Sequence, residues 1–464
     1  MPADRDAILD SARYLRNVRP LDPAELREYV EGRPHEAVVR QVLREHAVDL
    51  GVVEREDGTF VPANDDPIAP AFDGVTELPE AYAWAVEDLL VERWGANWHR
   101  GDSGDTLRET VRGFKEEYLQ QEAVEYDADV ALGYAIYHLP AYYAAVQYAL
   151  ADLADDGLFS GNLRVLDVGA GVGGPALGLF DLLPEDALVE YHAVEPSDAA
   201  VDVLERLLEE APRNVHPEIH RETAEAFDPE GEYDLVMLCS VLSELEDPVP
   251  VVEKYLDALA DTGTLLALAP ADENTSTQLR DVERAVEDEA ATVYGPTPRL
   301  WTGERPTDYG WSFDQRPDVD APATQRRLAE AAERPSEFQN TDVKFSYSLL
   351  RTDGRRQHDA DLSGGQLLKL ADADDWVTQR ADAVVAKLSR NLADEDANPL
   401  FKVSDGSEDT ECYAVLVNET SLNRALREAD YGDLLSIESA LVLWNDDEGA
   451  YNLVVDEETV VDRA

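Results

Sequence analysis

The stretch Val165-Leu-Asp-Val-Gly-Ala-Gly-Val-Gly-Gly174 joins a short apolar run to a segment with helical periodicity. Gly169 and Gly171 let the backbone turn tightly and approach a ligand where a Cβ atom would clash. The amides at the start of the following helix favour the electronegative end of that ligand. A glycine loop of this kind is equally compatible with a dinucleotide site, so the residues around it must decide.

Acidic residues beside the loop distinguish the two ligands. Asp167 ends the first strand, where nicotinamide sites usually carry small apolar residues, and it can approach the methionine ammonium of S-adenosylmethionine. Glu195 ends the next strand, where a carboxylate can accept both ribose hydroxyl protons, a role that dinucleotide and S-adenosylmethionine sites share. Glu225 precedes a later strand, where adenine recognition is expected; the alternative for the whole set is a structural loop without a ligand. The residues expected to contact this cofactor are Asp167, Gly169, Ala170, Gly171, Gly173, Glu195, Glu225 and Cys239.

Strand and helix signals alternate through the middle of the chain. Apolar strands are expected at 164–168, 189–194, 233–239 and 264–269, with helical segments such as 197–211 between them. Alternation of this kind predicts a parallel sheet with helices on both faces. The fold class is therefore α/β, a doubly wound, Rossmann-like core of the class I methyltransferase type.

The N-terminal residues have a different pattern. Residues 6–61 indicate three helices followed by a hairpin that turns at Asp57-Gly58. This order is typical of a winged-helix domain, and its third helix carries Arg40 and Arg44 one turn apart. These arginines suit a nucleic-acid contact, but a packing or dimerisation module has the same layout, and the fold alone does not choose.

Length and composition predict several domains. A chain of 464 residues is too long for one ordinary core. We expect a winged-helix-like domain at 1–61, a linker and helix at 62–104, the methyltransferase-like core with a helical lead-in at 105–356, and a small acidic β-rich segment at 357–464.

The charge balance is strongly acidic, with 99 acidic and 39 basic residues and a formal net charge of −60. Because 44% of the residues are hydrophobic, we interpret this as a folded, halophilic protein and not as a disordered one. At molar salt the Debye length is about 3 Å, so nucleic acid stays open as a partner. No secretory signal and no apolar run of about 18 residues is present, which predicts a soluble, cytoplasmic protein without a membrane partner.

The reactive end of the expected pocket is less defined. The strand at 233–239 continues as Cys239-Ser-Val-Leu-Ser-Glu-Leu245, which offers no evident general base. Ser240, Ser243 and Glu244 would lie near the pocket mouth, although Ser243 could cap a helix and Glu244 could face solvent. Methyl transfer depends mainly on in-line positioning, so a missing base does not exclude it. Catalytic residues stay unassigned, and the chain is either an active methyltransferase or a cofactor-binding protein that has lost the chemistry.

Five runs occur in the order found in one family: the run from Tyr134 to Ala145 around His138-Leu-Pro140, the 165–174 loop, Cys239-Ser-Val-Leu-Ser-Glu-Leu245, Gly310-Trp-Ser-Phe-Asp-Gln-Arg316 and Lys344-Phe-Ser-Tyr-Ser-Leu-Leu350. Over roughly residues 105–355 the chain resembles the Rsm twenty-two family, methyltransferase-like proteins of the small ribosomal subunit that include mitochondrial ribosome assembly factors. The composition points to a haloarchaeal-type member. The resemblance implies association with small-subunit ribosomal RNA or with an assembling subunit.

The chain departs from that family at its metal site. The resemblance implies an iron–sulfur cluster on four cysteines, some near the positions of Gly295, Thr297 and Gly310. Because a cluster needs about four thiolates and the chain has only Cys239 and Cys412, no cluster is expected. We expect packing of the prolines and tryptophans of this loop to hold it instead, through Pro296, Pro298, Trp301 and Trp311.

The same loop is the candidate RNA contact. Residues 295–356 contain ten basic and ten acidic side chains, which makes the region neutral within a very acidic chain. Aromatic side chains there could stack on bases beside arginines. The candidates are Arg299, Trp301, Trp311 and Arg316. In the alternative, the aromatics belong to the core and the arginines pair with neighbouring carboxylates.

Two other functions compete with the ribosomal one. Small-molecule O-methyltransferases also join a winged-helix dimerisation domain to this fold, but they usually need a histidine base after the fourth strand, and residues 221–357 contain no histidine. A winged-helix transcription regulator that senses S-adenosylmethionine would bind DNA through residues 6–61. The sequence fixes neither the methylated atom nor the oligomeric state.

Overall fold

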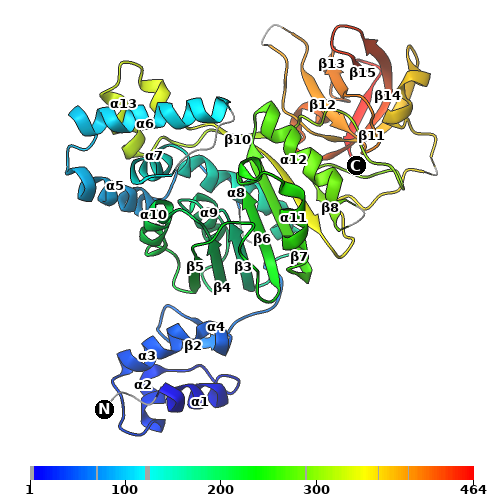
Figure 1. Cartoon of the computed structure of the whole chain (residues 1–464). Helices are drawn as coiled ribbons and strands as arrows, with labels where there is room; N and C mark the ends of the chain where they lie inside the picture. Colours follow the sequence, from blue (N-terminus) through cyan, green and yellow to red (C-terminus); the bar gives the residue numbers. More distant parts are fainter. Residues whose placement is uncertain (1–4, 69–71, 121–125, 288–289, 364, 395–396) are drawn as a thin grey trace. The chain divides into compact units, whose positions relative to one another are not determined.

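The protein was described from a computed structural model that covers residues 5–68, 72–120, 126–287, 290–363, 365–394 and 397–464. The chain divides into two compact units. The first combines Met1–Leu235 with Asp318–Thr341, and the second combines Val236–Pro317 with Asp342–Ala464. Figure 1 gives the labels of the helices and strands.

The N-terminal part of the first unit consists of short helices followed by a hairpin. Its elements are α1 (Arg5–Leu15), α2 (Pro23–Leu26), the 3-10 helix η1 (Arg27–Tyr29), α3 (Glu36–Glu45), α4 (Ala47–Leu50), β1 (Val52–Glu54) and β2 (Phe60–Pro62). The third helix expected from the sequence is broken at His46, whose φ of −120° is not helical, so it forms α3 and α4. Gly58, at φ +81°, makes the hairpin turn. The winged-helix assignment itself stays a prediction.

The side chain of Asn214 ties this part to the rest of the first unit. Its Oδ1 accepts from the Glu54 amide at 2.8 Å, and its Nδ2 donates to the Glu54 carbonyl at 3.2 Å. Leu188, at the start of a sheet strand, belongs to the same buried apolar cluster as Ile8, Leu43 and Phe60. The N-terminal helices are therefore packed on the sheet rather than tethered by a linker alone.

A group of helices leads into the sheet. They are α5 (Glu80–Trp94), α6 (Gly101–Gln120), α7 (Ala128–Tyr137) and α8 (Leu139–Asp155), joined later in the chain by α13 (Ala323–Glu330) and η3 (Pro335–Phe338). Helix α8 lies very close to the first helix after the glycine loop. A Cβ atom on Gly178 would be 2.3 Å from the Tyr143 carbonyl oxygen, so only glycine allows this approach.

In the first unit, β5 (Val215–His220), β4 (Leu188–Val194) and β3 (Asn162–Val168) lie side by side in that order and run parallel. The connections are α9 (Gly174–Leu182) and α10 (Asp198–Leu208), the latter capped by the Ser197 side chain. Strand β5 was missed by the sequence analysis because its run, Val-His-Pro-Glu-Ile-His, is polar and contains a proline.

In the second unit the sheet strands lie in the order β6-β7-β10-β8, with β9 paired to β10. The elements are β6 (Tyr233–Cys239), η2 (Leu242–Glu244), α11 (Pro248–Leu256), β7 (Leu259–Pro270), α12 (Glu273–Val286), β8 (Thr292–Gly295), β9 (Asp314–Arg316) and β10 (Val343–Arg351). Strand β10 is antiparallel to β7, so the sheet is mixed, and the expectation of a wholly parallel sheet was wrong. A long excursion separates β7 from β10, in place of the single crossover helix that a parallel pair requires.

The C-terminal residues form a small closed β-structure (Figure 1). Its strands are β11 (Arg380–Lys387), β12 (Leu400–Ser404), β13 (Cys412–Leu416), β14 (Leu434–Asn445), β15 (Ala450–Val455) and β16 (Val460–Arg463), with η4 (Leu370–Trp376) and α14 (Ala425–Glu428) beside them. The order is β11-β12-β13-β15-β14-β16, and β11 also pairs with β14, which closes the ring. The expected β-rich character of this segment agrees with the structure. Among the described residues, no helix has the length and apolar character needed to cross a bilayer.

Candidate cofactor site

The glycine loop has the left-handed backbone that its sequence requires. Gly169, Gly171 and Gly173 have φ values of +73°, +54° and +91°. A Cβ atom on Gly173 would lie 2.6 Å from a methyl carbon of Leu204, so this glycine is also needed for close packing. The Gly169 and Ala170 amides donate to the Val194 carbonyl at 2.8 and 3.2 Å, which holds the loop against β4.

Asp167 is fully buried beneath this loop. Its Oδ2 accepts a hydrogen bond of 2.8 Å from the Tyr191 hydroxyl, whereas its Oδ1 has no hydrogen-bond partner among the described residues. Burial, together with the nearby charge of Glu195, raises the pKa of Asp167 to about 7. A buried carboxylate oxygen without a hydrogen-bond donor lowers the stability of the folded protein unless a ligand supplies the donor.

Glu195 directly follows β4, and its carboxylate contacts the same loop. Its Oε2 accepts from the Gly171 amide at 2.9 Å and its Oε1 accepts from the Ser197 amide at 2.8 Å. Burial raises the pKa of Glu195, and these two amides act against that rise. Each carboxylate oxygen can accept a second hydrogen bond, so Glu195 can still bind a pair of hydroxyl groups.

The structure brings only part of the expected cofactor set together. Asp167, Gly169, Ala170, Gly171 and Glu195 form one compact cluster in the first unit. Glu225 lies in the loop after β5 with an exposed side chain, and its role stays a prediction. Cys239 is buried at the end of β6, in the second unit.

Ser240 follows directly on Cys239 and has an unusual backbone. Its φ is +61°, a left-handed conformation that a serine rarely adopts. Its amide donates to the Leu268 carbonyl at 2.7 Å, and its buried Oγ has no hydrogen-bond partner among the described residues. Strained residues of this kind concentrate at functional sites. Ser243 and Glu244 both have exposed side chains, which agrees with the alternative interpretation for Glu244, whereas Ser243 lies within η2 and is not its N-cap residue.

The site also depends on residues that the sequence analysis missed. Tyr191, one residue before His192 on β4, fixes the orientation of Asp167. Its partner could not be identified from sequence, because the two side chains meet only through the pairing of β3 with β4. Ser197 could have been found, since Pro-Ser-Asp before an apolar periodic run is a helix N-cap signal.

The RNA-contact candidates are mostly engaged within the second unit. Arg299 is buried and donates to both oxygens of Glu287 at 2.7 Å, so its assignment as an RNA contact was wrong. Arg316 is half-buried and pairs with Asp314 at 2.6 Å. The Trp301 indole donates to Asp405 at 2.7 Å. Trp311, which is 40% exposed, is the candidate that still faces solvent.

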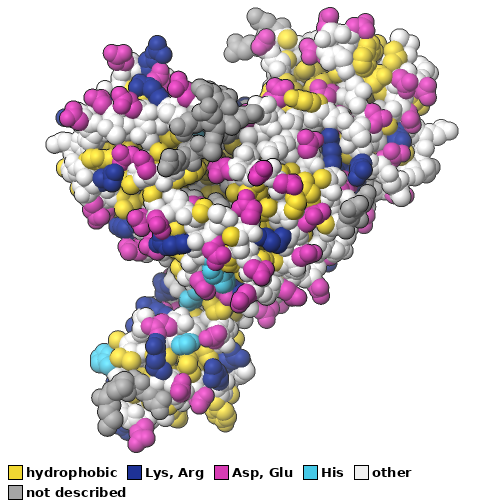
Figure 2. Space-filling model, in the orientation of Figure 1, with side chains coloured by type: hydrophobic (Ala, Val, Ile, Leu, Met, Phe, Trp, Pro, Cys, Tyr) yellow, Lys and Arg dark blue, Asp and Glu magenta, His cyan; other side chains and the backbone are white. Residues whose placement is uncertain are grey.

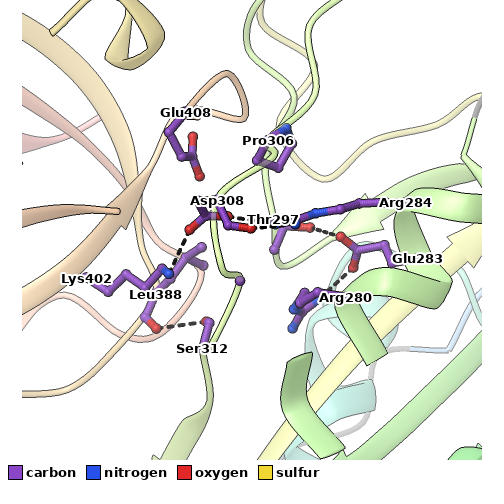
Figure 3. Close-up of a pocket in the computed structure, with 11 residues that line it drawn as sticks. Arg280, Glu283, Arg284, Thr297, Pro306, Asp308, Ser312, Leu388, Lys402 and Glu408 are labelled. Atoms are coloured by element: carbon purple, nitrogen blue, oxygen red, sulfur yellow. Dashed lines mark hydrogen bonds and ion pairs between the residues drawn. The ribbon is translucent and has the colours of Figure 1, made fainter. Parts of the chain in front are cut away.

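Figure 3 shows the side chains around Thr297, in the region where the family resemblance would place a cluster. Asp308 lies between Lys402, at 2.8 Å, and Arg284, at 2.6 Å, while the Thr297 hydroxyl donates to Glu283 at 2.7 Å. The cavity among these side chains is about 10 Å³, too small for more than a single water molecule. Buried ion pairs therefore hold this loop together with the buried Pro296 and Pro298, whereas Trp311 is 40% exposed and contributes little to the expected packing.

The cysteines of the chain do not reproduce the four cysteine ligands that the family resemblance implies. Cys239 and Cys412 are the two cysteines of the chain, and both are buried and not disulfide-bonded. Neither lies within the 295–310 segment where the family resemblance would place thiolates. Four thiolates cannot be assembled from this chain.

Arg40 and Arg44, the possible nucleic-acid contacts of the N-terminal part, both lie beside Glu54. The Arg44 Nε atom is 2.5 Å from one Glu54 oxygen and the Arg40 Nε atom is 3.6 Å from the other. Glu54 is buried, so both guanidinium groups are held against the hairpin. Because the Arg40 and Arg44 side chains are still 40% and 47% exposed, the choice between a nucleic-acid contact and a packing or dimerisation module stays a prediction.

Comparison with protein families gives three matches. Residues 166–265 match a family described as "Methyltransferase domain". Residues 5–56 and 371–464 match the N-terminal and C-terminal domains of one further family, described as "Domain of unknown function (DUF8157)". No curated protein matches the chain.

The solved structures that match the chain share little sequence with it. An S-adenosylmethionine-dependent methyltransferase from Clostridium acetobutylicum is 12% identical, with a TM-score of 0.25; the match covers 40% of this chain and 64% of that one. The plantazolicin methyltransferase BamL, solved with S-adenosylhomocysteine, is 9% identical, with a TM-score of 0.30 and coverages of 59% and 97%. A SAM-dependent methyltransferase from Aquifex aeolicus is 16% identical, with a TM-score of 0.29 and coverages of 38% and 93%.

Likenesses this low carry no argument about substrate. The family match is more informative, because it begins at Leu166 and contains the glycine loop, Glu195 and the end of β6. It confirms the prediction of a methyltransferase domain, and with it S-adenosylmethionine as the cofactor type. Residues 166–265 therefore match the methyltransferase-domain family over the segment that carries the glycine loop and Glu195.

Proposed function

We propose that this chain binds S-adenosylmethionine through Asp167, the 169–173 loop and Glu195, and methylates RNA of the small ribosomal subunit. One observation carries the cofactor assignment: the buried Oδ1 of Asp167 has no partner among the described residues. When bound, the cofactor supplies an electrophilic methyl group on a sulfonium. The side chains of the protein bind and orient this cofactor.

Asp167 suits the ammonium group of the methionine part. Tyr191 already occupies Oδ2, so Oδ1 is the oxygen left for a cationic donor. A positive charge there favours the ionised carboxylate and lowers the pKa of Asp167 from its value of about 7. Cofactor binding therefore strengthens as the pH rises through 7.

Glu195 suits the ribose. Its two oxygens are oriented by the Gly171 and Ser197 amides, and each has a free acceptor position. The open backbone at Gly169 and Gly171 lets a ligand approach without meeting a Cβ atom.

The RNA part of the proposal comes from the resemblance to the Rsm twenty-two family over residues 105–355. Trp311 remains available for stacking on a base, whereas Arg299 does not. In the face shown in Figure 2, basic side chains are scattered singly or in small groups among acidic ones. Such a surface fits an RNA partner only where salt screens repulsion, as in molar potassium chloride.

Isothermal titration with S-adenosylhomocysteine tests the cofactor site. Asp167→Asn should weaken binding about 10–100-fold, because it removes a charge-assisted hydrogen bond worth about 1.5–3 kcal/mol. The matched control is Asp181→Asn, since Asp181 also accepts from tyrosine hydroxyls, those of Tyr82 and Tyr143, at 3.0 and 2.8 Å. Equal affinities for the wild type and Asp167→Asn would reject the assignment.

A labelled methyl-transfer assay tests the substrate. Small subunits purified from a strain that lacks the gene should accept label from S-adenosylmethionine at molar potassium chloride, and wild-type subunits should not. If the deletion strain lacks no methyl group in its ribosomal RNA, the enzymatic form of the proposal is rejected. Label recovered in a small-molecule fraction would instead favour the O-methyltransferase alternative.

A further inference from the structure

Two histidines and a glutamate meet on one face of the edge of the sheet. His192 lies on β4, directly opposite Glu218 of β5 in the strand register, and His220 follows two residues later on β5. Alternate residues of a strand share a face, so all three side chains emerge on the same side. This face is opposite to that of Tyr191, which contacts Asp167, so the cluster is separate from the cofactor site.

The potential ligand atoms lie within coordination range of one another. His192 Nδ1 is 3.0 Å from His220 Nε2. The Glu218 carboxylate has one oxygen 3.9 Å from His192 Nδ1 and the other 3.9 Å from His220 Nε2. All three ligand atoms fall within 4.8 Å. Ligands bound tetrahedrally to Zn²⁺ at about 2.05 Å are about 3.3 Å apart, so small shifts of these side chains would complete a site.

Glu190 sets the tautomer that a metal requires. Its Oε1 lies 2.9 Å from His192 Nε2 and 3.2 Å from the Nε atom of Arg164. Because a carboxylate only accepts, the proton of a neutral His192 ring lies on Nε2, and the lone pair lies on Nδ1, toward His220 and Glu218. A carboxylate behind a ligating histidine is the usual outer-shell partner of a zinc site.

We propose that His192, His220 and Glu218 bind a divalent cation of the zinc class. Two imidazole nitrogens and one carboxylate are borderline ligands that suit Zn²⁺ better than Mg²⁺ or Ca²⁺, which prefer oxygen. Three protein ligands leave the fourth tetrahedral position to water. The proposal does not depend on methyl transfer.

The cation would fix the end of the sheet next to the cofactor loop. The Glu195 amide donates to the His220 carbonyl at 3.0 Å. Cross-linking β4 to β5 through His192 and His220 therefore restrains the backbone from which Glu195 projects. The site is a structural brace, and its first measurable effect is on metal affinity and thermal stability.

Titration of the untagged full chain with ZnCl₂ tests the site, in excess Mg²⁺ to occupy acidic surface groups. We expect one tight site, with a rise in Tm. His220→Gln should weaken Zn²⁺ binding by more than the 10–100-fold expected on losing an outer-shell partner, the effect predicted for Glu190→Gln. Glu218 is exposed, so Glu218→Gln removes a ligand with little risk to folding. Co²⁺ in place of Zn²⁺ should give the intense absorption of a tetrahedral site.

The matched control is His216→Gln, on the same strand but outside the three-residue set. It should leave Zn²⁺ affinity unchanged. Weak binding at many sites, unchanged by His220→Gln and by Glu218→Gln, would overturn the proposal. So would equal losses in His216→Gln and His220→Gln, because the effect would then reflect general damage to β5.

Discussion

Asp167 in the first unit and Glu283 in the second are both buried carboxylates, but their surroundings differ in kind. Asp167 has one hydroxyl partner, and burial raises its pKa to about 7. Glu283 accepts from Arg280 at 2.5 Å and from the hydroxyls of Thr297 and Ser348, each at 2.7 Å. Burial acts to raise the pKa of Glu283 too, yet the guanidinium groups of Arg280 and Arg299 hold it below its ordinary value.

The difference separates a site built for a ligand from one that is complete in itself. The Asp167 region keeps a buried oxygen without a hydrogen bond, which destabilises the ligand-free protein, and a bound cationic group would remove that cost. The Glu283 region has its own cations, and removing any one leaves a buried charge without compensation. Substitutions in the two regions should therefore change stability in opposite directions.

The largest effect is expected from Arg299→Met. The substitution leaves Glu287 buried without its bidentate partner, which should lower the free energy of unfolding by about 3–5 kcal/mol. Urea denaturation at fixed salt measures the change. Arg334→Met is the control, because Arg334 is 80% exposed and should change stability by no more than about 0.5 kcal/mol. If both variants lose the same amount, the buried network is not what holds this loop.

Asp167→Asn should act in the opposite direction on the ligand-free protein. The folded-state pKa is raised above its unfolded value, so the wild type loses stability as the pH rises from about 4 to 7. Asparagine removes that loss, which is at most about 4 kcal/mol at pH 8, from about three pKa units at 1.36 kcal/mol each. Thermal melts at pH 5 and pH 8 check the prediction. A variant that is less stable than the wild type at pH 8 would contradict it.

Glu408→Gln tests whether a buried carboxyl of the second unit also makes stability depend on pH. Burial, followed by the charges of Asp308 and Asp405, raises the pKa of Glu408 to about 7. The wild type should lose stability as the pH rises through that value, and the glutamine variant should not. Thermal melts from pH 5 to pH 8 should show a difference in Tm between the two proteins that grows as the pH rises. Parallel curves would mean that Glu408 is not a source of pH dependence.

Salt should have the smallest differential effect. With a net charge of −60, repulsion between surface carboxylates should lower the Tm at low salt, and potassium chloride should raise it. The stability difference between wild type and Arg299→Met should change by only a few tenths of a kcal/mol, because buried pairs are poorly screened. A difference that collapses at high salt would show that the Arg299 network is reached by solvent.

The same contrast explains what the sequence could predict. The glycine loop imposes backbone conformations that few residues can adopt, Asp167 directly precedes it, and Glu195 follows the next strand, so the pocket could be predicted from local sequence. The partners of Arg299 and Asp308 come from segments as distant as Glu287 and Lys402, and no local pattern marks such pairs. Trp311 was expected either to pack or to contact RNA, and its 40% exposure could not be predicted because it depends on distant segments of the chain. His192 and His220 lie 28 residues apart and meet only through strand pairing.

Asn214 gives the sheet a mechanical connection to the N-terminal helices. Its amide group holds both backbone groups of Glu54, and the next residue begins β5. At the other end of that strand, His220 holds the Glu195 amide. Force applied to the N-terminal helices would therefore travel along one six-residue strand to the carboxylate at the cofactor loop. A partner that pulls on those helices would therefore displace Glu195 and change the cofactor pocket without contacting it.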